Sequence, residues 1–145
     1  MPNYEHPRPA FTVDIVAVRP ANLDWVLLVR RGNEPFKDSW ALPGGFVDEN
    51  ERPEDAGRRE LAEETGLSYE GPLRLVGVYG DPGRDPRGWT VSAVYLALVP
   101  GDPEVRGADD AAEAKWFPAD ALPPLAFDHA RIVADALQLI AQQYS

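Results

Sequence analysis

The segment over residues 45–67, GFVDENERPEDAGRRELAEETGL, constrains the fold of this 145-residue chain more than any other. Proline suits the first turn of a helix, acids suit its positive end, and glycine suits the position just past its last residue. Pro53 and Gly66 therefore predict a helix over residues 53–65. Seven of these residues are charged, which leaves few to anchor the helix in a core. Its apolar residues are Ala56, Leu61 and Ala62.

Three glutamates crowd the end of this predicted helix. Successive helical residues turn by about 100°, so the carboxylates of Glu60, Glu63 and Glu64 can converge. The helix dipole disfavours anions in the last turn, and like charges three and four residues apart repel. A cluster of acids most often forms a solvated face. A divalent cation offers a second interpretation, because Mg²⁺ and Mn²⁺ prefer hard oxygen ligands.

Two neighbouring residues fit the cation interpretation. Gly57, one turn before Glu60, is expected to remove side-chain bulk near the acidic face. Glu51, just before the helix, is expected to reach Arg59 or a backbone N–H. Both would shape the acidic site from outside it.

Composition narrows the function classes. The formal net charge of −10 disfavours nonspecific duplex binding, which depends on basic residues, and the lack of cysteine excludes disulfides and thiolate chemistry. No stretch approaches the roughly 20 apolar residues of a membrane span, and the amino terminus lacks the apolar run of a signal peptide. We expect a single domain over residues 1–145, located in the cytoplasm, that binds cations and small molecules rather than nucleic acid or membrane.

The remaining elements follow from hydrophobic periodicity. The pattern predicts a final helix over residues 128–143, with Asp128 as its N-cap. Strands or extended pieces alternate with loops rich in glycine and proline before it, which favours an α+β fold, an α/β/α sandwich around a mixed sheet. The predicted strands cover residues 11–18, 25–29, 40–47, 73–79, 89–99 and 114–117.

Residues 45–67 also resemble the signature of the Nudix hydrolases. The resemblance rests on Gly45, five residues, Glu51, seven residues, and then RELAEETGL at residues 59–67. It implies a Nudix-type α/β/α sandwich that hydrolyses a nucleoside diphosphate linked to another group. It also implies that Glu60, Glu63 and Glu64 bind Mg²⁺ or Mn²⁺, with Glu51 and Arg59 bracing the loop.

Later motifs bear on the substrate. Pro82 lies fifteen residues after Leu67, a spacing that in this family marks ADP-ribose pyrophosphatases. The strings RDPRGWTVS and LAFDHARI look like small bacterial and archaeal enzymes of that kind, and they also occur in Nudix-related regulators that sense ADP-ribose. Those regulators carry a winged-helix domain after the Nudix domain. The chain ends soon after LAFDH, so we expect no DNA-reading part.

Substrate contacts are expected in two places. The resemblance extends to WALPGG at residues 40–45, where Gly44 and Gly45 allow close approach of the backbone to phosphate. Arg84 and Arg87 can offer guanidinium groups to a diphosphate or a terminal ribose. A turn in which Asp81 or Asp85 pairs with these arginines is the alternative.

The remaining candidates lie near the end of the chain. The family commonly places a further acid on a loop there, as a metal ligand or general base, and Asp110 is favoured over Glu113 and Asp109. His129 follows Asp128, where capping or packing is more typical than catalysis. Three aromatic residues can stack on adenine or pack in the core. They are Trp40, Phe46 and Phe127.

The resulting hypothesis is a metal-dependent pyrophosphatase that converts ADP-ribose and water to AMP and ribose 5-phosphate. Catalytic roles are expected for Glu60, Glu64, Asp110 and Glu113, and substrate contacts for Pro82 together with the glycines and arginines above. Two alternatives stay open. One is a hydrolase of NADH, a nucleotide sugar or an oxidised nucleotide, and the other is a noncatalytic ADP-ribose sensor. Relatives of this kind are often homodimers, and the strand-rich amino terminus permits one here.

Overall fold

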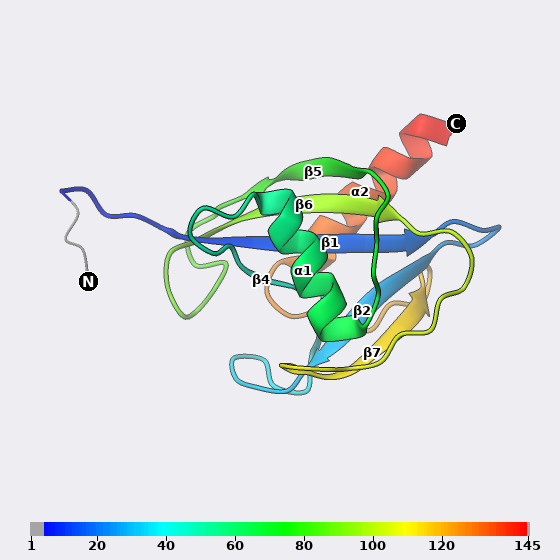
Figure 1. Cartoon of the computed structure of the whole chain (residues 1–145), viewed down its shortest axis with the longest axis horizontal. Coiled ribbons are helices and arrows are strands. Elements are labelled where there is room, and N and C mark those ends of the chain that lie inside the picture. Colours follow the sequence, from blue (N-terminus) through cyan, green and yellow to red (C-terminus); the bar gives the residue numbers. More distant parts are fainter. Residues whose placement is uncertain (1–4, 145) are drawn as a thin grey trace.

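A mixed β-sheet forms the centre of the protein in a computed structural model that describes residues 5–144. The strand order is β3-β2-β1-β6-β5, with β4 paired to β1 and β7 paired to β2 (Figure 1). The β1–β6 pair is parallel and the other pairs are antiparallel. The strands are β1 (Ala10–Arg19), β2 (Trp25–Arg31), β3 (Trp40–Ala41), β4 (Gly44–Phe46), β5 (Leu73–Tyr79), β6 (Thr90–Leu98) and β7 (Ala111–Pro118).

The sheet opens between β1 and β2. These strands pair only at Val18↔Val26 and Arg19↔Trp25, next to the turn that joins them. Towards the start of β1, β4 lies beside it instead, with Asp14 opposite Gly44. The opening therefore lies between β1 and β4 on one side and β2 on the other.

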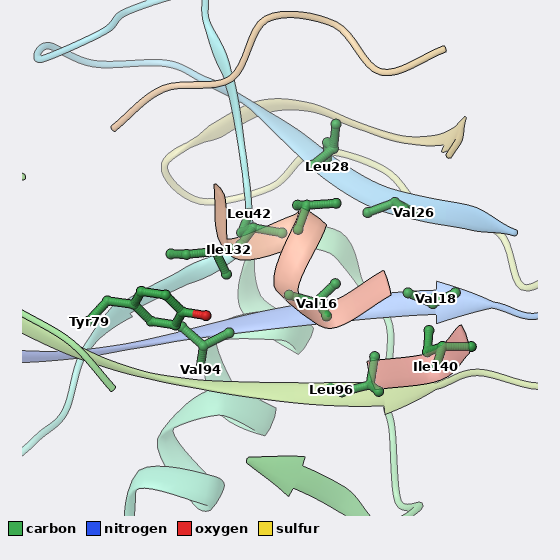
Figure 2. Packing of buried hydrophobic residues seen from close by; sticks show 12 residues of the cluster. Val16, Val18, Val26, Leu28, Leu42, Tyr79, Val94, Leu96, Ile132 and Ile140 are labelled. Carbon is green, nitrogen blue, oxygen red and sulfur yellow. The ribbon is translucent and has the colours of Figure 1, made fainter. Parts of the chain in front are cut away.

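Two helices cover the two faces of the sheet (Figure 1). They are α1 (Pro53–Thr65) and α2 (His129–Tyr144). Alternate residues of β1 point to opposite faces. Ile15 packs in the cluster that contains Leu61 of α1, whereas Val16 packs in the cluster that contains Ile132 and Val133 of α2 (Figure 2). Because both faces are covered, β1 is buried over most of its length.

The anchoring of α1 differs from the sequence expectation. Ala56 and Leu61 are buried as expected, but Ala62 is exposed and the buried face is completed by Gly57, Glu64 and Thr65. A Cβ on Gly57 would lie 2.6 Å from Cδ1 of Ile15. Gly57 thus lets the helix approach β1, which is a packing role rather than the expected relief of bulk around the acids.

The architecture confirms the predicted α+β fold, an α/β/α sandwich with a mixed sheet. The helix expected over residues 53–65 is α1, and it ends at Gly66 in the left-handed conformation. The strand expected from residue 114 begins earlier, at Ala111, because its ladder with β2 continues to Arg31. No helix among residues 5–144 is long and apolar enough to cross a membrane.

Candidate active site

A cavity of about 450 Å³ occupies the opening between β1, β4 and β2. It brings together segments that are far apart in the sequence. One group of its lining residues, called the acidic wall here, consists of Glu60, Glu64 and Asp110. A second group, called the basic wall, consists of Arg31, Arg84 and Arg87. The other polar residues that line the cavity include Asp14, Asp85 and His129.

Arg59 organises the loop in front of α1. Its guanidinium donates to Glu51 at 2.9 and 3.0 Å and to the Phe46 carbonyl at 3.1 Å. It also lies 2.8 Å from Glu60, 3.3 Å from Glu63 and 3.5 Å from Asp48. Glu51 accepts a further hydrogen bond from the Asp48 N–H at 3.0 Å. Both contacts that the sequence suggested for Glu51 are therefore present. The Arg59 guanidinium forms ion pairs with four carboxylates.

The two glycines of β4 bring backbone against the acidic wall. The Gly44 N–H donates to Oε1 of Glu64 at 2.7 Å. A Cβ on Gly44 would collide with the Val13 carbonyl and the Asp14 carboxylate, and one on Gly45 would lie 2.6 Å from the Glu60 carboxyl carbon. The glycines thus permit close approach to the acids, and both line the cavity.

Ionisation of the Glu60 and Glu64 carboxyl groups is energetically unfavourable in the acidic wall. Burial raises the pKa of Glu64 to about 8, and the neighbouring charges of Glu60, Asp14 and Asp110 act in the same direction. Burial also raises the pKa of Glu60, although the hydrogen bond from Arg59 opposes it. In a low-dielectric site, a carboxylate without a cationic partner prefers to be protonated. A bound cation would reverse that preference.

The donor chemistry of this wall fits a hard divalent cation. Glu60 and Glu64 offer oxygen ligands beside a cavity large enough for further oxygen donors from substrate or water. Glu63 lies on the same helix, but its side chain is 42% exposed and contacts Arg59 rather than lining the cavity. Among residues 5–144, no three acidic or histidine side chains already form a metal-binding cluster.

The three acids considered near residue 110 lie in different environments. Asp110 lines the cavity, and its backbone carbonyl accepts from the Gly32 N–H at 3.2 Å. Glu113 lies on β7, where its carboxylate accepts from Nε of Arg30 at 3.3 Å, and it does not line the cavity. Asp109 acts on the cavity only through its charge, which raises the pKa of Glu60. The structure thus brings Asp110, and not Glu113, to the acidic wall.

The loop over residues 80–88 places its arginines in ion pairs. Arg84 donates two hydrogen bonds, at 2.8 and 2.9 Å, to Asp128, and its side chain is only 6% exposed. Arg87 is held by Asp85, with Nη2 to Oδ2 at 2.8 Å. Both line the cavity, whereas Pro82 is exposed and does not. The ion-paired turn that the sequence left open is therefore present for Arg87, while Arg84 pairs with a residue at the start of α2.

His129 supports the backbone of the cavity. Its Nδ1 accepts from the Leu42 N–H at 3.0 Å, and its Nε2 lies 3.8 Å from Oδ2 of Asp14. Burial lowers the pKa of His129. Asp14 in turn accepts from the Ser92 hydroxyl at 2.7 Å. His129 is thus a buried packing and hydrogen-bonding residue, in line with the sequence interpretation, and it also lines the cavity.

Asp128 occupies the expected position at the start of α2. Its backbone carbonyl accepts from the Ile132 N–H at 3.3 Å, as an N-cap carbonyl does. Its carboxylate, expected to cap the helix, accepts from Arg84 instead. This carboxylate therefore links the loop over residues 80–88 to α2.

The aromatic candidates lie in two environments. Phe127 lines the cavity, with its ring centroid 4.8 Å from that of Phe36. Phe46 also lines the cavity and is 53% exposed. Trp40 packs edge-on against Phe117 with centroids 4.8 Å apart and is absent from the cavity lining. Two of the three can therefore contact a ligand.

Sequence reasoning did not single out Arg31 or Asp14, although both line the cavity. Asp14 lies inside the core strand predicted over residues 11–18, Arg31 lies just after the strand predicted over residues 25–29, and neither belongs to the matched signature. The only available signal was a charged residue inside or at the end of an apolar run. Arg30 and Asp24 carry the same signal, and neither lines the cavity.

Comparison with known proteins agrees with this geometry. The sequence profile of the NUDIX domain matches residues 8–136. An ADP-ribose pyrophosphatase from Methanocaldococcus jannaschii is 48% identical over 113 residues, which cover 78% of this chain and 66% of that protein. The chain thus spans slightly less than two thirds of the length of this curated relative.

Two solved structures share the fold. The NUDIX domain of NrtR from Shewanella oneidensis, complexed with ADP ribose, has a TM-score of 0.84 at 35% identity and covers 95% of this chain and 94% of that one. A bifunctional NMN adenylyltransferase/ADP ribose pyrophosphatase from Francisella tularensis, complexed with AMP and a manganese ion, has a TM-score of 0.77 at 30% identity. It covers 94% of this chain and 43% of that one. With the fold, the cavity and the matched profile in agreement, the chain belongs to the NUDIX domain family.

Proposed function

We propose that this protein is a metal-dependent hydrolase that converts ADP-ribose and water to AMP and ribose 5-phosphate. The P–O–P bond breaks, the oxygen of water joins one phosphorus, and the bridging oxygen leaves with the other phosphate. The 48% identity to an archaeal ADP-ribose pyrophosphatase supports the substrate class.

One observation carries the proposal: an acidic wall and a basic wall face the same cavity of about 450 Å³. A nucleotide diphosphate bears negative charge at its centre and an apolar base at one end. The arginines and the rings of Phe46 and Phe127 complement these parts, and the acids leave room for a cation between protein and phosphate.

Mg²⁺ or Mn²⁺ would be held by Glu60 and Glu64, with Glu63 as a third ligand after a change of its side-chain conformation. A bound ion of this kind supplies charge neutralisation for the diphosphate and lowers the pKa of water. Arg59 and Glu51 hold the loop so that Glu60 stays at the cavity. Gly44 donates its N–H to Glu64 and fixes that carboxylate.

Asp110 is our candidate for the base that takes a proton from the attacking water, with Glu60 as the alternative. Asp110 lines the cavity and forms no ion pair within residues 5–144, whereas the Arg59 guanidinium lies on the Glu60 carboxylate at 2.8 Å. A general base needs a free lone pair within reach of the proton it accepts. Asp110 meets that requirement better.

A substrate screen tests the proposal. ADP-ribose, NADH, a nucleotide sugar and an oxidised nucleoside triphosphate are compared by kcat/KM with Mg²⁺ and with Mn²⁺, in water labelled with ¹⁸O. We expect ADP-ribose to be preferred, and the labelled product identifies the attacked phosphorus. A higher kcat/KM for any other compound would overturn the choice of substrate.

A noncatalytic ADP-ribose sensor is the second candidate. The observation in its favour is the ADP ribose complex of a NUDIX domain that is 35% identical and covers nearly the whole chain. Calorimetry that detects ADP-ribose binding, combined with no release of AMP in either metal, would favour the sensor. Release of AMP would exclude it.

A further inference from the structure

The three arginines of the basic wall differ in how their charge is compensated. Asp128 holds Arg84 through two hydrogen bonds, and Asp85 holds Arg87 in the same manner. Arg31 forms no ion pair within residues 5–144. Its one side-chain hydrogen bond runs from Nε to the Pro35 carbonyl at 2.7 Å. The terminal nitrogens of Arg31 are therefore the cavity donors without a carboxylate partner.

The backbone fixes Arg31 at this place. It donates its N–H to the Ser39 carbonyl and accepts from the Asp38 N–H, both at 2.8 Å. The ladder between β2 and β7 shifts register between Arg30 and Arg31, so that Arg31 pairs with Ala111. Bulges of this kind re-aim side chains next to functional sites. The neighbouring Gly32–Asp110 hydrogen bond places Arg31 close to the acidic wall.

Phe127 leaves the edge of the Arg31 guanidinium available. The ring centroid of Phe127 lies 5.0 Å from Cζ of Arg31 and 5.7 Å from Cζ of Arg87. A ring attracts a guanidinium through its face, which leaves the in-plane N–H groups to other acceptors. Phe127 itself has a φ of 55°, which is uncommon for a residue other than glycine. Residues in such conformations cluster at ligand-binding sites.

The charged form of Arg31 is disfavoured in the cavity. Burial lowers the pKa of Arg31, and the nearby charge of Arg87 lowers it further. The charges of Glu64, Asp85 and Asp110 only partly offset this. An anion between the two guanidinium groups would relieve their repulsion, because each is attracted to it.

We infer that Arg31 binds a phosphate oxygen of the substrate and is the main phosphate-binding side chain of the basic wall. This inference rests on the proposed function for the identity of the substrate, a nucleoside diphosphate. Arg84 and Arg87 then shape the wall while their charges stay with Asp128 and Asp85. The assignment differs from the expectation from the sequence, which placed the arginine contacts to substrate at Arg84 and Arg87 on the loop over residues 80–88.

The matched variants are Arg31→Gln and Arg30→Gln. Arg30 is the preceding residue of β2, and its guanidinium pairs with Asp38 and Glu113 outside the cavity. We expect Arg31→Gln to weaken ADP-ribose binding about 10- to 100-fold, the loss of one or two charge-assisted hydrogen bonds. Arg30→Gln is expected to change it less than about threefold. Titration calorimetry in Mg²⁺-free buffer measures both.

Adenosine serves as the uncharged probe. Its affinity should be the same in wild type and Arg31→Gln, because it has no phosphate for Arg31 to contact. In turnover assays the loss should appear mainly in KM, since a contact made equally in ground and transition states lowers binding without changing kcat. Arg31→Lys keeps the positive charge but loses the planar pair of N–H donors, so its affinity for ADP-ribose should lie between those of wild type and Arg31→Gln. If Arg31→Gln does not fold, Arg31→Lys takes its place in the comparison.

The outcomes separate this inference from the proposed function. Equal ADP-ribose affinity in Arg31→Gln and Arg30→Gln would overturn the role of Arg31, even in an active pyrophosphatase. Equal losses for adenosine and ADP-ribose would also overturn it. If the wild-type protein neither binds nor hydrolyses ADP-ribose, but binds ADP with an affinity that Arg31→Gln lowers, the proposed substrate is wrong. The phosphate-binding role of Arg31 is then still supported.

Discussion

The acidic and basic walls line one cavity but balance their charges differently. Each of Arg84 and Arg87 has an aspartate of its own, so that this part of the basic wall is neutralised within the protein. On the other side, Glu60 shares Arg59 with three other carboxylates, and Glu64 has only a backbone N–H. The charges of Arg84 and Arg87 are thus compensated within the protein, whereas those of Glu60 and Glu64 are compensated only in part. Variants of each wall should therefore have opposite consequences for stability and activity.

The largest effect is expected at the acidic wall. Glu64→Gln keeps an oxygen for the Gly44 N–H but removes a metal ligand, so kcat in Mg²⁺ should fall by about 10³ or more, equivalent to several kcal/mol of transition-state stabilisation. Glu63→Gln should also lower kcat, by a smaller factor because Glu63 lies outside the cavity lining. Circular dichroism should show both variants folded. Full activity in both would remove the metal-site assignment.

The next effect separates two acids of one region. Asp110→Asn should lower kcat by about 10², the usual contribution of a general base. Glu113→Gln is the control, because its carboxylate contacts Arg30 away from the cavity. Its kcat should stay within about threefold of wild type. A larger loss in Glu113→Gln than in Asp110→Asn would reverse the assignment.

The ion-paired part of the basic wall, Arg84 and Arg87, should respond mainly in stability. Arg84→Gln leaves the partly buried Asp128 carboxylate without its partner, which should cost about 3 kcal/mol of unfolding free energy. The double variant Arg84→Gln with Asp128→Asn should recover part of that loss. Urea denaturation of the two single variants and the double variant measures the coupling. A coupling near zero would show that the pair contributes nothing to holding the loop on α2.

The smallest effect is a pH dependence of the metal-free protein. Because the pKa of Glu64 is raised to about 8 when folded, the folded state holds a proton that the unfolded state has released. Stability should therefore fall as pH rises. Because the ordinary pKa of a glutamate is 4.5, this loss of stability extends from about pH 4.5 to 8. Above about pH 6.5, the ordinary pKa of histidine, the buried His129 is neutral in both states and no longer opposes the trend, so pH 6.5 to 8 is the range to measure. We expect Tm to drop by several degrees, measured by differential scanning fluorimetry.

Two controls sharpen that measurement. Glu64→Gln cannot titrate at this position, so its Tm should change less over the same pH range and should exceed that of wild type at pH 8. Saturating Mg²⁺ should flatten the wild-type curve because it stabilises the ionised carboxylates. A wild-type Tm that rises with pH in this range would contradict the raised pKa of Glu64.

Local patterns determined much of this protein. Pro53 and Gly66 defined α1 to the residue, since helix ends depend on the chemistry of a few neighbouring positions. Hydrophobic periodicity located the strands and the second helix, and the spacing of acids and glycines indicated the family. The contacts of Glu51 were also predictable, because Arg59 and the Asp48 N–H are close to it in sequence.

Only the tertiary structure decided which charged residues meet. Arg30 and Arg31 are adjacent in sequence and chemically identical, but in the folded protein Arg31 lines the cavity and Arg30 forms ion pairs outside it. In the same manner, Arg84 was a substrate candidate until folding placed Asp128, distant in sequence, against its guanidinium. Charges act through space, so the partner that neutralises each one depends on strand register and loop docking, which no local pattern specifies.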